Sequence, residues 1–208
     1  MNQVWLALQR RWWRHKTRHA PLAALLSEPL PHTEFADTRY VVIDLETTAL
    51  DAANGEIASI AWVVIEGAAI HLNQSRYYHV ALEKGVGQSA VFHHLTDTAL
   101  KQGVPVEVAM SALLADLAHS TLVFHNAQLD MSFINKVCRS LWGAPLLLPV
   151  EDTLQLEHKK LSRQSEMVRP GALRLFQCRQ RYGLPDVNLH DALGDALATA
   201  ELWLAMNS

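Results

Sequence analysis

Cysteine and long hydrophobic runs are both scarce in this sequence of 208 residues. Cys138 and Cys178 are its two cysteines, and they lack the CxxC spacing that is typical of a thiolate metal site. Two cysteines are also too few for a disulfide framework, and no stretch approaches the roughly 20 apolar residues that a membrane-spanning helix requires. We therefore expect neither a disulfide-stabilised scaffold nor a membrane span.

The layout of a secretion signal is missing as well, because the basic cluster near the N-terminus follows a short apolar run instead of preceding it. The chain is 50% hydrophobic and 19% charged with a net charge of −3, which is typical of a globular protein and not of a disordered one. These features predict a cytoplasmic protein with one domain and an appendage.

Basic residues are distributed unevenly along the chain. Five of the 18 Lys and Arg residues lie within residues 1–20, which contain no acidic residue, and a second basic stretch runs from residue 158 to residue 181. Such stretches attract a polyanion, although a solvated helix face is the commoner explanation for them. Charge by itself leaves both interpretations open.

The pattern predicts a basic helical leader with a proline-containing connector (residues 1–36) and a main domain (residues 37–208). Residues 1 to about 27 are expected to be helical, with Trp5, Leu8 and Trp12 on one face. This face either packs on the domain or on a second copy of the chain, or it docks nucleic acid or a partner protein. An anionic membrane is a third alternative.

Beyond the leader, three strand patterns in succession are followed by strands that alternate with helices. This order predicts an α/β fold, with a mixed sheet flanked by helices. The strands are expected at 40–45, 57–65, about 69–80, 121–124 and 146–150, and the helices at about 105–119, 128–140, 153–162, 170–182 and 190–206.

Two acidic residues end the first predicted strand. Asp44 and Glu46 follow an apolar, β-branched run, and residues i and i+2 of a strand point to the same face. Like charges this close raise each other's pKa unless a cation holds them ionised, and hard oxygen ligands suit Mg²⁺ or Mn²⁺. For this pattern alone, a pair of solvated acids beyond the strand is the commoner explanation.

Two later segments carry further polar residues. Asp130 is expected one turn into a helix that Asn126 caps, where a carboxylate also meets the positive end of the helix dipole. His190 and Asp195 lie at the start of the last predicted helix, where they could flank a common site. Each signal is weak alone, because a helix-start acid and a surface pair explain these residues equally well.

Together, these segments resemble the histidine-bearing branch of the DEDD 3′–5′ exonuclease superfamily, which includes proofreading epsilon subunits, ribonuclease T and oligoribonuclease. The resemblance rests on "DLETTAL" (44–50), "HNAQLD" (125–130) and "HDALGDA" (190–196), which occur in the family's order. It extends from about Tyr40 to Leu204. It implies a ribonuclease H-like fold, here with an N-terminal helical extension.

The resemblance also implies a two-metal-ion mechanism that hydrolyses the last phosphodiester bond at a 3′ end. Two Mg²⁺ or Mn²⁺ ions per site would bracket the scissile phosphate, one activating water and the other stabilising the leaving oxygen. In this analogy Asp44 bridges both ions. Glu46 and Asp195 complete the site on the nucleophile side, and Asp130 holds the second ion through water. His190 takes the proton from the attacking water.

The family further holds the terminal nucleotide with backbone amides and a side-chain wedge that follow the first motif. The resemblance implies substrate contacts for five residues: Thr47, Thr48, Leu50, His94 and Asn126. Ala49 stands where the first motif of the family usually has glycine, so the fit of the substrate terminus is expected to differ there.

From this resemblance we expect a 3′–5′ exonuclease that acts on single-stranded or frayed DNA ends and releases nucleoside 5′-monophosphates, in proofreading or repair. One alternative is an exoribonuclease or short-oligonucleotide hydrolase with the same site. Another is a catalytically silent module that binds nucleic acid or a polymerase. The expected partners are nucleic acid 3′ ends, with DNA favoured over RNA, a polymerase or another replication or repair protein, and a second copy of the chain.

Overall fold

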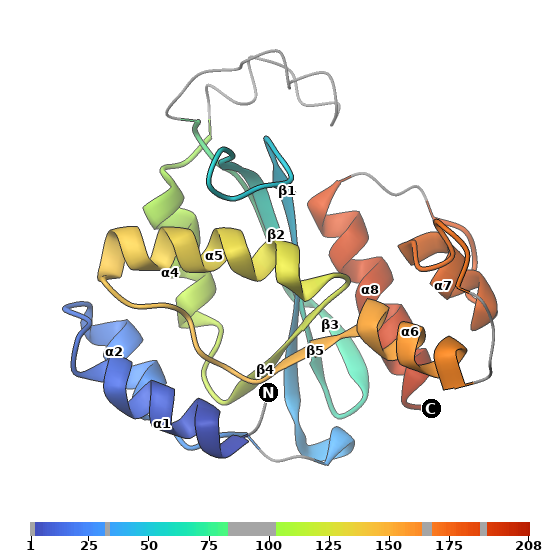
Figure 1. Ribbon diagram of the computed structural model, residues 1–208, viewed down its shortest axis with the longest axis horizontal. Coiled ribbons are helices and arrows are strands. Elements are labelled where there is room, and N and C mark those ends of the chain that lie inside the picture. Colours follow the sequence, from blue (N-terminus) through green and yellow to red (C-terminus); the bar gives the residue numbers. More distant parts are fainter. Residues whose placement is uncertain (1–2, 32–33, 83–102, 164–167, 188–190) are drawn as a thin grey trace.

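The fold centres on a mixed sheet in which two antiparallel pairings are extended by two parallel ones. The computed structural model describes residues 3–31, 34–82, 103–163, 168–187 and 191–208. The strands of this sheet are β1 (Arg39–Thr47), β2 (Ile57–Glu66), β3 (Ala69–His79), β4 (Ser120–Phe124) and β5 (Val150–Asp152). Their order is β3–β2–β1–β4–β5, so β1 lies at the centre, antiparallel to β2 and parallel to β4 (Figure 1).

Helices cover both faces of the sheet, as the sequence predicts (Figure 1). In chain order they are α1 (Gln3–Arg14), α2 (Ala20–Ser27), the 3₁₀ helix η1 (Phe35–Asp37), α4 (Val106–Ala115), α5 (Ala127–Trp142), α6 (Thr153–Arg163), α7 (Leu175–Arg181) and α8 (Ala192–Met206). No helix in these described segments is long and apolar enough to cross a bilayer.

Alternating residues of β1 enter two separate hydrophobic clusters. Val41, Ile43 and Leu45 pack with residues of α2, α4 and α5 on one face. Tyr40 and Val42 point to the opposite face, where they meet buried residues of α8. Because both faces are covered, the central strands consist of nearly continuous buried apolar residues.

Helix α8 lies close to the sheet because small residues line its buried side. Ala192, Ala196 and Ala200 are each fully buried, and α8 contacts both β1 and β2. Small side chains let a helix backbone approach a sheet closely. This packing brings the first turn of α8 to the end of β1, where the polar residues lie.

Two predicted elements begin later in the structure than expected. The strand expected at 146–150 begins only at Val150, although Leu146 and Leu148 are buried in the core. Prolines at 145 and 149 lack the amide hydrogen that a strand needs. The apolar run between them therefore packs in the core without forming a strand. The helix expected at 170–182 begins at Leu175, because the preceding residues form turns around Gly171, whose φ is +81°.

The leader is also not one continuous helix. Helix α1 ends at Arg14, and α2 begins at Ala20, where the ring of His19 accepts a hydrogen bond from the Leu22 amide at 3.4 Å. The His19 ring stacks on Trp142 with 4.4 Å between ring centroids. Residues of α2 therefore pack on the end of α5 and belong to the main hydrophobic core.

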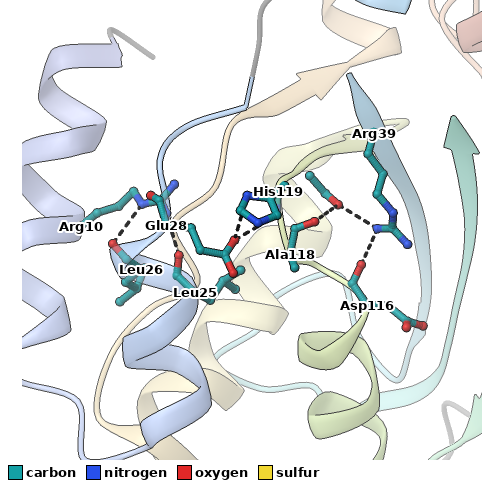
Figure 2. Close-up of polar contacts among 9 residues, drawn as sticks. Arg10, Leu25, Leu26, Glu28, Arg39, Asp116, Ala118 and His119 are labelled. Carbon is teal, nitrogen blue, oxygen red and sulfur yellow. Dashed lines mark hydrogen bonds and ion pairs between the residues drawn. The ribbon is translucent and has the colours of Figure 1, made fainter. Parts of the chain in front are cut away.

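A buried arginine connects the two leader helices. Arg10 is 3% exposed, and its guanidinium donates hydrogen bonds to the carbonyl oxygens of Leu25 (2.7 Å), Leu26 (3.4 Å) and Glu28 (2.9 Å) (Figure 2). These carbonyls lie at the end of α2, where helical carbonyls run out of backbone donors, and the Leu25 carbonyl also accepts a hydrogen bond from the Glu28 amide at 3.3 Å. The Glu28 carboxylate in turn accepts a hydrogen bond from the His119 amide at 2.9 Å, which ties the leader to the start of β4.

The start of β1 is held by a second arginine in the same region. Arg39 donates to the Asp116 carbonyl (Figure 2) and to the Ser120 hydroxyl at 2.8 Å. It also forms a 2.7 Å salt bridge with Glu66. It therefore connects the central strand with β2 and β4.

The predicted apolar face of the leader does not pack on the domain. Trp5, Leu8 and Trp12 are 55%, 61% and 52% exposed, whereas Leu6 and Arg10 are the buried residues of α1. Because Arg10 must reach the end of α2, the side of α1 that carries it turns inward and the tryptophan side turns outward. The alternative in which Trp5, Leu8 and Trp12 pack on the same chain is therefore wrong.

We predict that Arg10→Ala lowers the free energy of unfolding of the full chain by about 2 kcal/mol, because it leaves buried carbonyl groups at the end of α2 without donors. Urea denaturation followed by circular dichroism measures this change. Arg11→Ala is the matched control, since Arg11 is exposed on the same helix and its loss should change stability by less than about 0.5 kcal/mol. Equal stability of the two variants would contradict the role of Arg10.

Candidate functional site

The C-terminal end of β1 carries the two acids that the sequence singles out. Asp44 and Glu46 continue the face of β1 that points to α8, following Tyr40 and Val42. Their cross-strand neighbours on β2 are Ala61 and Ser59. These small residues leave room above the strand for the first turn of α8.

Three carboxylates meet in that space. One oxygen of each of Asp44, Glu46 and Asp195 lies within 4.8 Å of the others. Glu46 is buried, and the other two are half-buried. The two β1 residues come from a rigid central strand and Asp195 comes from the first turn of α8, so secondary structure fixes all three positions.

Asp130 approaches the same place from the other face of the sheet. It lies in the first turn of α5 and is 6% exposed. Burial is the main cause that raises its pKa to about 7, hydrogen bonds with the backbone of Asp130 itself and of Leu45 act in the opposite direction, and the charges of Asp152 and Glu46 raise the pKa further. Asp130 is therefore an acid that lies close to the other three and shares their electrostatic field.

The other acids also act on Asp44. Its pKa is raised well above the ordinary value, first by burial and then by the charges of Asp130, Asp195, Glu46 and Asp191. Every charged group among these causes is another carboxylate. A buried cluster of this kind is stable in its ionised form only with a cation, and an all-oxygen donor set fits Mg²⁺ or Mn²⁺. The residues present therefore suit a divalent ion.

Asp152 holds the helix that positions Asp130. Its carboxylate accepts hydrogen bonds from the amides of Asn126 (3.1 Å) and Ala127 (3.0 Å), which begin α5, and from those of Leu154 (3.0 Å) and Gln155 (3.3 Å), which begin α6. One side chain thus caps two helices. Asp152 is not among the residues predicted from the sequence, although an acid directly before a predicted helix is a usable signal for a cap.

The capping role expected for the Asn126 side chain is therefore wrong. Asn126 occupies the N-cap position with φ +84° and ψ +56°, but its side chain makes no capping hydrogen bond. This left-handed conformation directs two successive amides at Asp152, and asparagine tolerates it better than most residues do. Asn126 is half-buried beside Asp130, so the substrate contact expected for it stays a prediction.

The turn after β1 carries the other residues expected to contact substrate. The Thr47 hydroxyl donates to the Ala49 carbonyl (2.8 Å), and the Thr48 hydroxyl accepts from the Glu56 amide (2.9 Å), so both side chains order the turn. Leu50 is 86% exposed. Gly55 packs closely against this turn, where a Cβ on it would lie 3.0 Å from both Ala49 and the Phe133 ring. A larger residue at position 55 would therefore displace its neighbours.

Two expected residues, His94 and His190, lie outside the described residues. Asp191, which follows His190, is the N-cap of α8, and its carboxylate accepts a hydrogen bond from the Gly194 amide at 2.9 Å. The roles expected for both histidines stay predictions.

Comparison with known families and sequences gives a consistent result. The profile of the RNase T family, described as exonuclease, matches residues 41–203. The chain is 30% identical to the PolC-type DNA polymerase III of Thermotoga maritima over 173 residues, which cover 82% of this chain but 12% of that protein. It is 28% identical to the DNA polymerase III subunit epsilon of Aquifex aeolicus over 173 residues, which cover 81% of this chain and 80% of that protein.

Solved structures share the fold, which is ribonuclease H-like. Exonuclease I of E. coli, solved with a dT13 oligonucleotide, superposes with a TM-score of 0.68 at 12% identity, covering 82% of this chain and 41% of that chain. Cell-death related nuclease 4 superposes with a TM-score of 0.65 at 17% identity, covering 81% of this chain and 63% of that one.

We predict that Asp130→Asn stabilises the metal-free protein at pH 8 but not at pH 4. With its pKa raised to about 7, folded Asp130 holds a proton between about pH 4 and about pH 7 that the unfolded chain releases. The stability of the wild type therefore falls as the pH rises through this interval, by roughly 4 kcal/mol, and then levels off. Urea denaturation in EDTA at a series of pH values measures the difference between the two proteins.

The control for this experiment is Glu34→Gln, which removes an exposed carboxylate away from the cluster. Its effect on stability should be small and independent of pH. A gain for Asp130→Asn that is equal at pH 4 and pH 8, or a loss at pH 8, would show that ionisation of the buried Asp130 does not destabilise the folded protein.

Proposed function

Because the chain belongs to the RNase T exonuclease family, we propose that it is a metal-dependent 3′–5′ exonuclease that removes nucleoside 5′-monophosphates from single-stranded or frayed DNA ends. The observation that carries this proposal is the meeting of three carboxylates within 4.8 Å, with Asp130 beside them. This donor set suits phosphodiester hydrolysis, which needs hard cations and open positions for water and phosphate oxygens.

In this proposal Asp44, Glu46, Asp195 and Asp130 hold two Mg²⁺ or Mn²⁺ ions. Bound ions of this type activate water and stabilise the charge that develops on the leaving oxygen. By analogy with the family, Asp44 would be the ligand that both ions share. The rigid strand and the two helix starts keep the ligand oxygens in place before substrate binds.

The remaining assignments concern proton transfer and the substrate terminus. His190 is proposed to take the proton from the attacking water, because an imidazole titrates near neutral pH. The turn that carries Thr47, Thr48 and Leu50 is proposed to hold the terminal nucleotide. Exposure of Leu50 beside the acids supports a role for its side chain as a wedge against the last base.

DNA is the favoured substrate because the relatives include polymerase III proteins by name and the similar exonuclease I was solved with a deoxyoligonucleotide. The polymerase III relatives also support our proposal of a role in replication proofreading or repair, inside the cell. An exoribonuclease, or a silent module that binds nucleic acid or a polymerase, is the alternative. The complete set of acids favours an active enzyme over the silent module.

We also propose a protein partner, of the polymerase or repair type, for the exposed side of α1. Val4, Trp5, Leu8 and Trp12 form this side, and basic residues surround it. The Lys16 ammonium lies 3.7 Å from the centroid of the Trp12 ring, so one face of that ring is already covered and is less available to a base. An apolar, acidic protein surface fits these side chains better than a polynucleotide does, and a second copy of this chain is the competing occupant.

We predict that cleavage requires Mg²⁺ or Mn²⁺ and that Asp44→Asn abolishes it by removing the shared ligand. Cleavage assays on end-labelled single-stranded DNA, duplex DNA and RNA, each with metal or with EDTA, measure the rate of cleavage, its polarity and the substrate preference. Asp186→Asn, which removes an exposed acid away from the cluster, should retain full activity. Full activity in EDTA would contradict the proposal. Faster cleavage of RNA would favour the exoribonuclease, and no cleavage of any substrate would favour the silent module.

We predict that His190→Ala lowers kcat by roughly 10²–10⁴-fold, the range typical of losing a general base, and leaves metal affinity unchanged. Steady-state kinetics give kcat, and Mn²⁺ titration by calorimetry gives the affinity. His158→Ala, at an exposed position of α6, is the control and should match the wild type. If His190→Ala cleaves at the wild-type rate, another group is the base.

A further inference from the structure

An open cavity of about 450 Å³ lies beside the turns at residues 168–174 and the first turn of α7, and none of the clustered carboxylates lines it. Its lining includes Arg169, Arg174, Phe176 and Gln177. Gly171 adopts φ +81° in this segment, and the Arg174 side chain folds over it. No acidic residue lines the cavity.

The two arginines of this cavity differ from the arginines beside them. Arg179 is buried and donates to the Ala198 carbonyl at 2.8 Å, and Arg181 pairs with the buried carboxylate of Glu157. Arg169 and Arg174 are exposed, and among the described residues neither guanidinium has a hydrogen bond or salt bridge. Their charge is therefore available to an anion, and a planar guanidinium suits phosphate oxygens.

Phe176 adds an aromatic surface to the same cavity. Its neighbours Leu175 and Cys178 pack with α8, whereas Phe176 stays 39% exposed. An exposed ring next to two unpaired guanidiniums matches a single-stranded polynucleotide, in which phosphates alternate with unpaired bases that stack on aromatic side chains. A duplex offers no free base face to such a ring.

The segment that lines the cavity contacts elements that lead to the carboxylate cluster. His125, at the end of β4, donates from Nε2 to the Leu173 carbonyl at 2.8 Å, and its Nδ1 lies 2.8 Å from the Thr153 hydroxyl. Asn126 and α5, which carries Asp130, follow directly. On its other side, α7 packs on α8, the helix of Asp195 (Figure 1). Helix α8 therefore contacts the segment that forms the cavity, and α5 is joined to the same segment through His125.

We propose that Arg169, Arg174 and Phe176 form a subsite for the nucleotides that precede the cleaved 3′-terminal nucleotide of a single strand. This inference rests on the proposed function. The two guanidiniums bind consecutive phosphates, and Phe176 stacks on one base. The subsite makes affinity depend on strand length, because a dinucleotide has a single phosphodiester, the one that is cleaved, and offers none to the two arginines.

The test compares the Arg169→Gln/Arg174→Gln double variant and Phe176→Ala with the wild type, using dT2 and fluorescein-labelled dT12. Arg76→Gln/Arg139→Gln is the matched control, since it removes two exposed charges from other parts of the surface. Steady-state cleavage with Mg²⁺ gives kcat and KM. Fluorescence anisotropy at several salt concentrations, in an Asp44→Asn background shared by all variants, gives Kd without cleavage.

For the arginine pair we expect KM for dT12 to rise at least 10-fold, with KM for dT2 and all kcat values unchanged. The slope of log Kd against log salt should become shallower by about 1.4, since about 0.7 is expected for each phosphate contact to a single strand. Phe176→Ala should weaken dT12 binding by about 5- to 150-fold, the range for one stacked base, without changing this slope.

The subsite is overturned if the arginine pair and Phe176→Ala bind dT12 no more weakly than the control pair, or if dT2 and dT12 are affected equally. This failure is distinct from failure of the proposed function. If the wild type cleaves DNA and the variants bind and cleave dT12 as it does, the subsite is wrong and the exonuclease proposal stands. Arginine-dependent binding of dT12 without any cleavage keeps the subsite and removes the enzyme.

Discussion

Four acids are brought together at the end of β1, and their mutual repulsion is the constraint on which the surrounding structure depends. Burial and neighbouring carboxylates both raise the pKa of Asp44 and of Asp130, so the ionised cluster is unfavourable until a cation neutralises it. Rigid elements oppose this repulsion. A central strand buried on both faces carries two of the acids, and two helices packed on opposite faces carry the others.

The helix starts show how backbone groups support this arrangement. Asp152 accepts four amide hydrogen bonds and so fixes the beginnings of α5 and α6 relative to each other. Its charge also contributes to the raised pKa of Asp130, so the residue that positions the helix adds to the repulsion. Asp152 therefore fixes the position of Asp130 but makes the ionised form of Asp130 less favourable. A bound divalent ion would offset this repulsion.

The leader extends the domain beyond the segment that its family shares. The family profile begins at residue 41, yet Leu22, Leu25 and Leu26 of α2 lie in the same core as β1, and Arg10 fixes α1 on α2. This arrangement presents the tryptophans of α1 to solvent while their helix stays docked. The exposed side is thereby held in a fixed orientation, as a surface for binding a partner requires.

Sequence alone determined the α/β class, the positions of β1, β2 and β4, and the identity of the acids, because strand alternation and motif order are local properties. Alternation also placed Asp44 and Glu46 on one face. The family resemblance added Asp195 to this pair, and the structure brings the three carboxylates together. Only the tertiary structure decided that the Asp152 carboxylate and not the Asn126 side chain caps α5, and that Arg10 turns the tryptophans outward. These outcomes depend on contacts between residues far apart in the chain, and no local pattern encodes such distances.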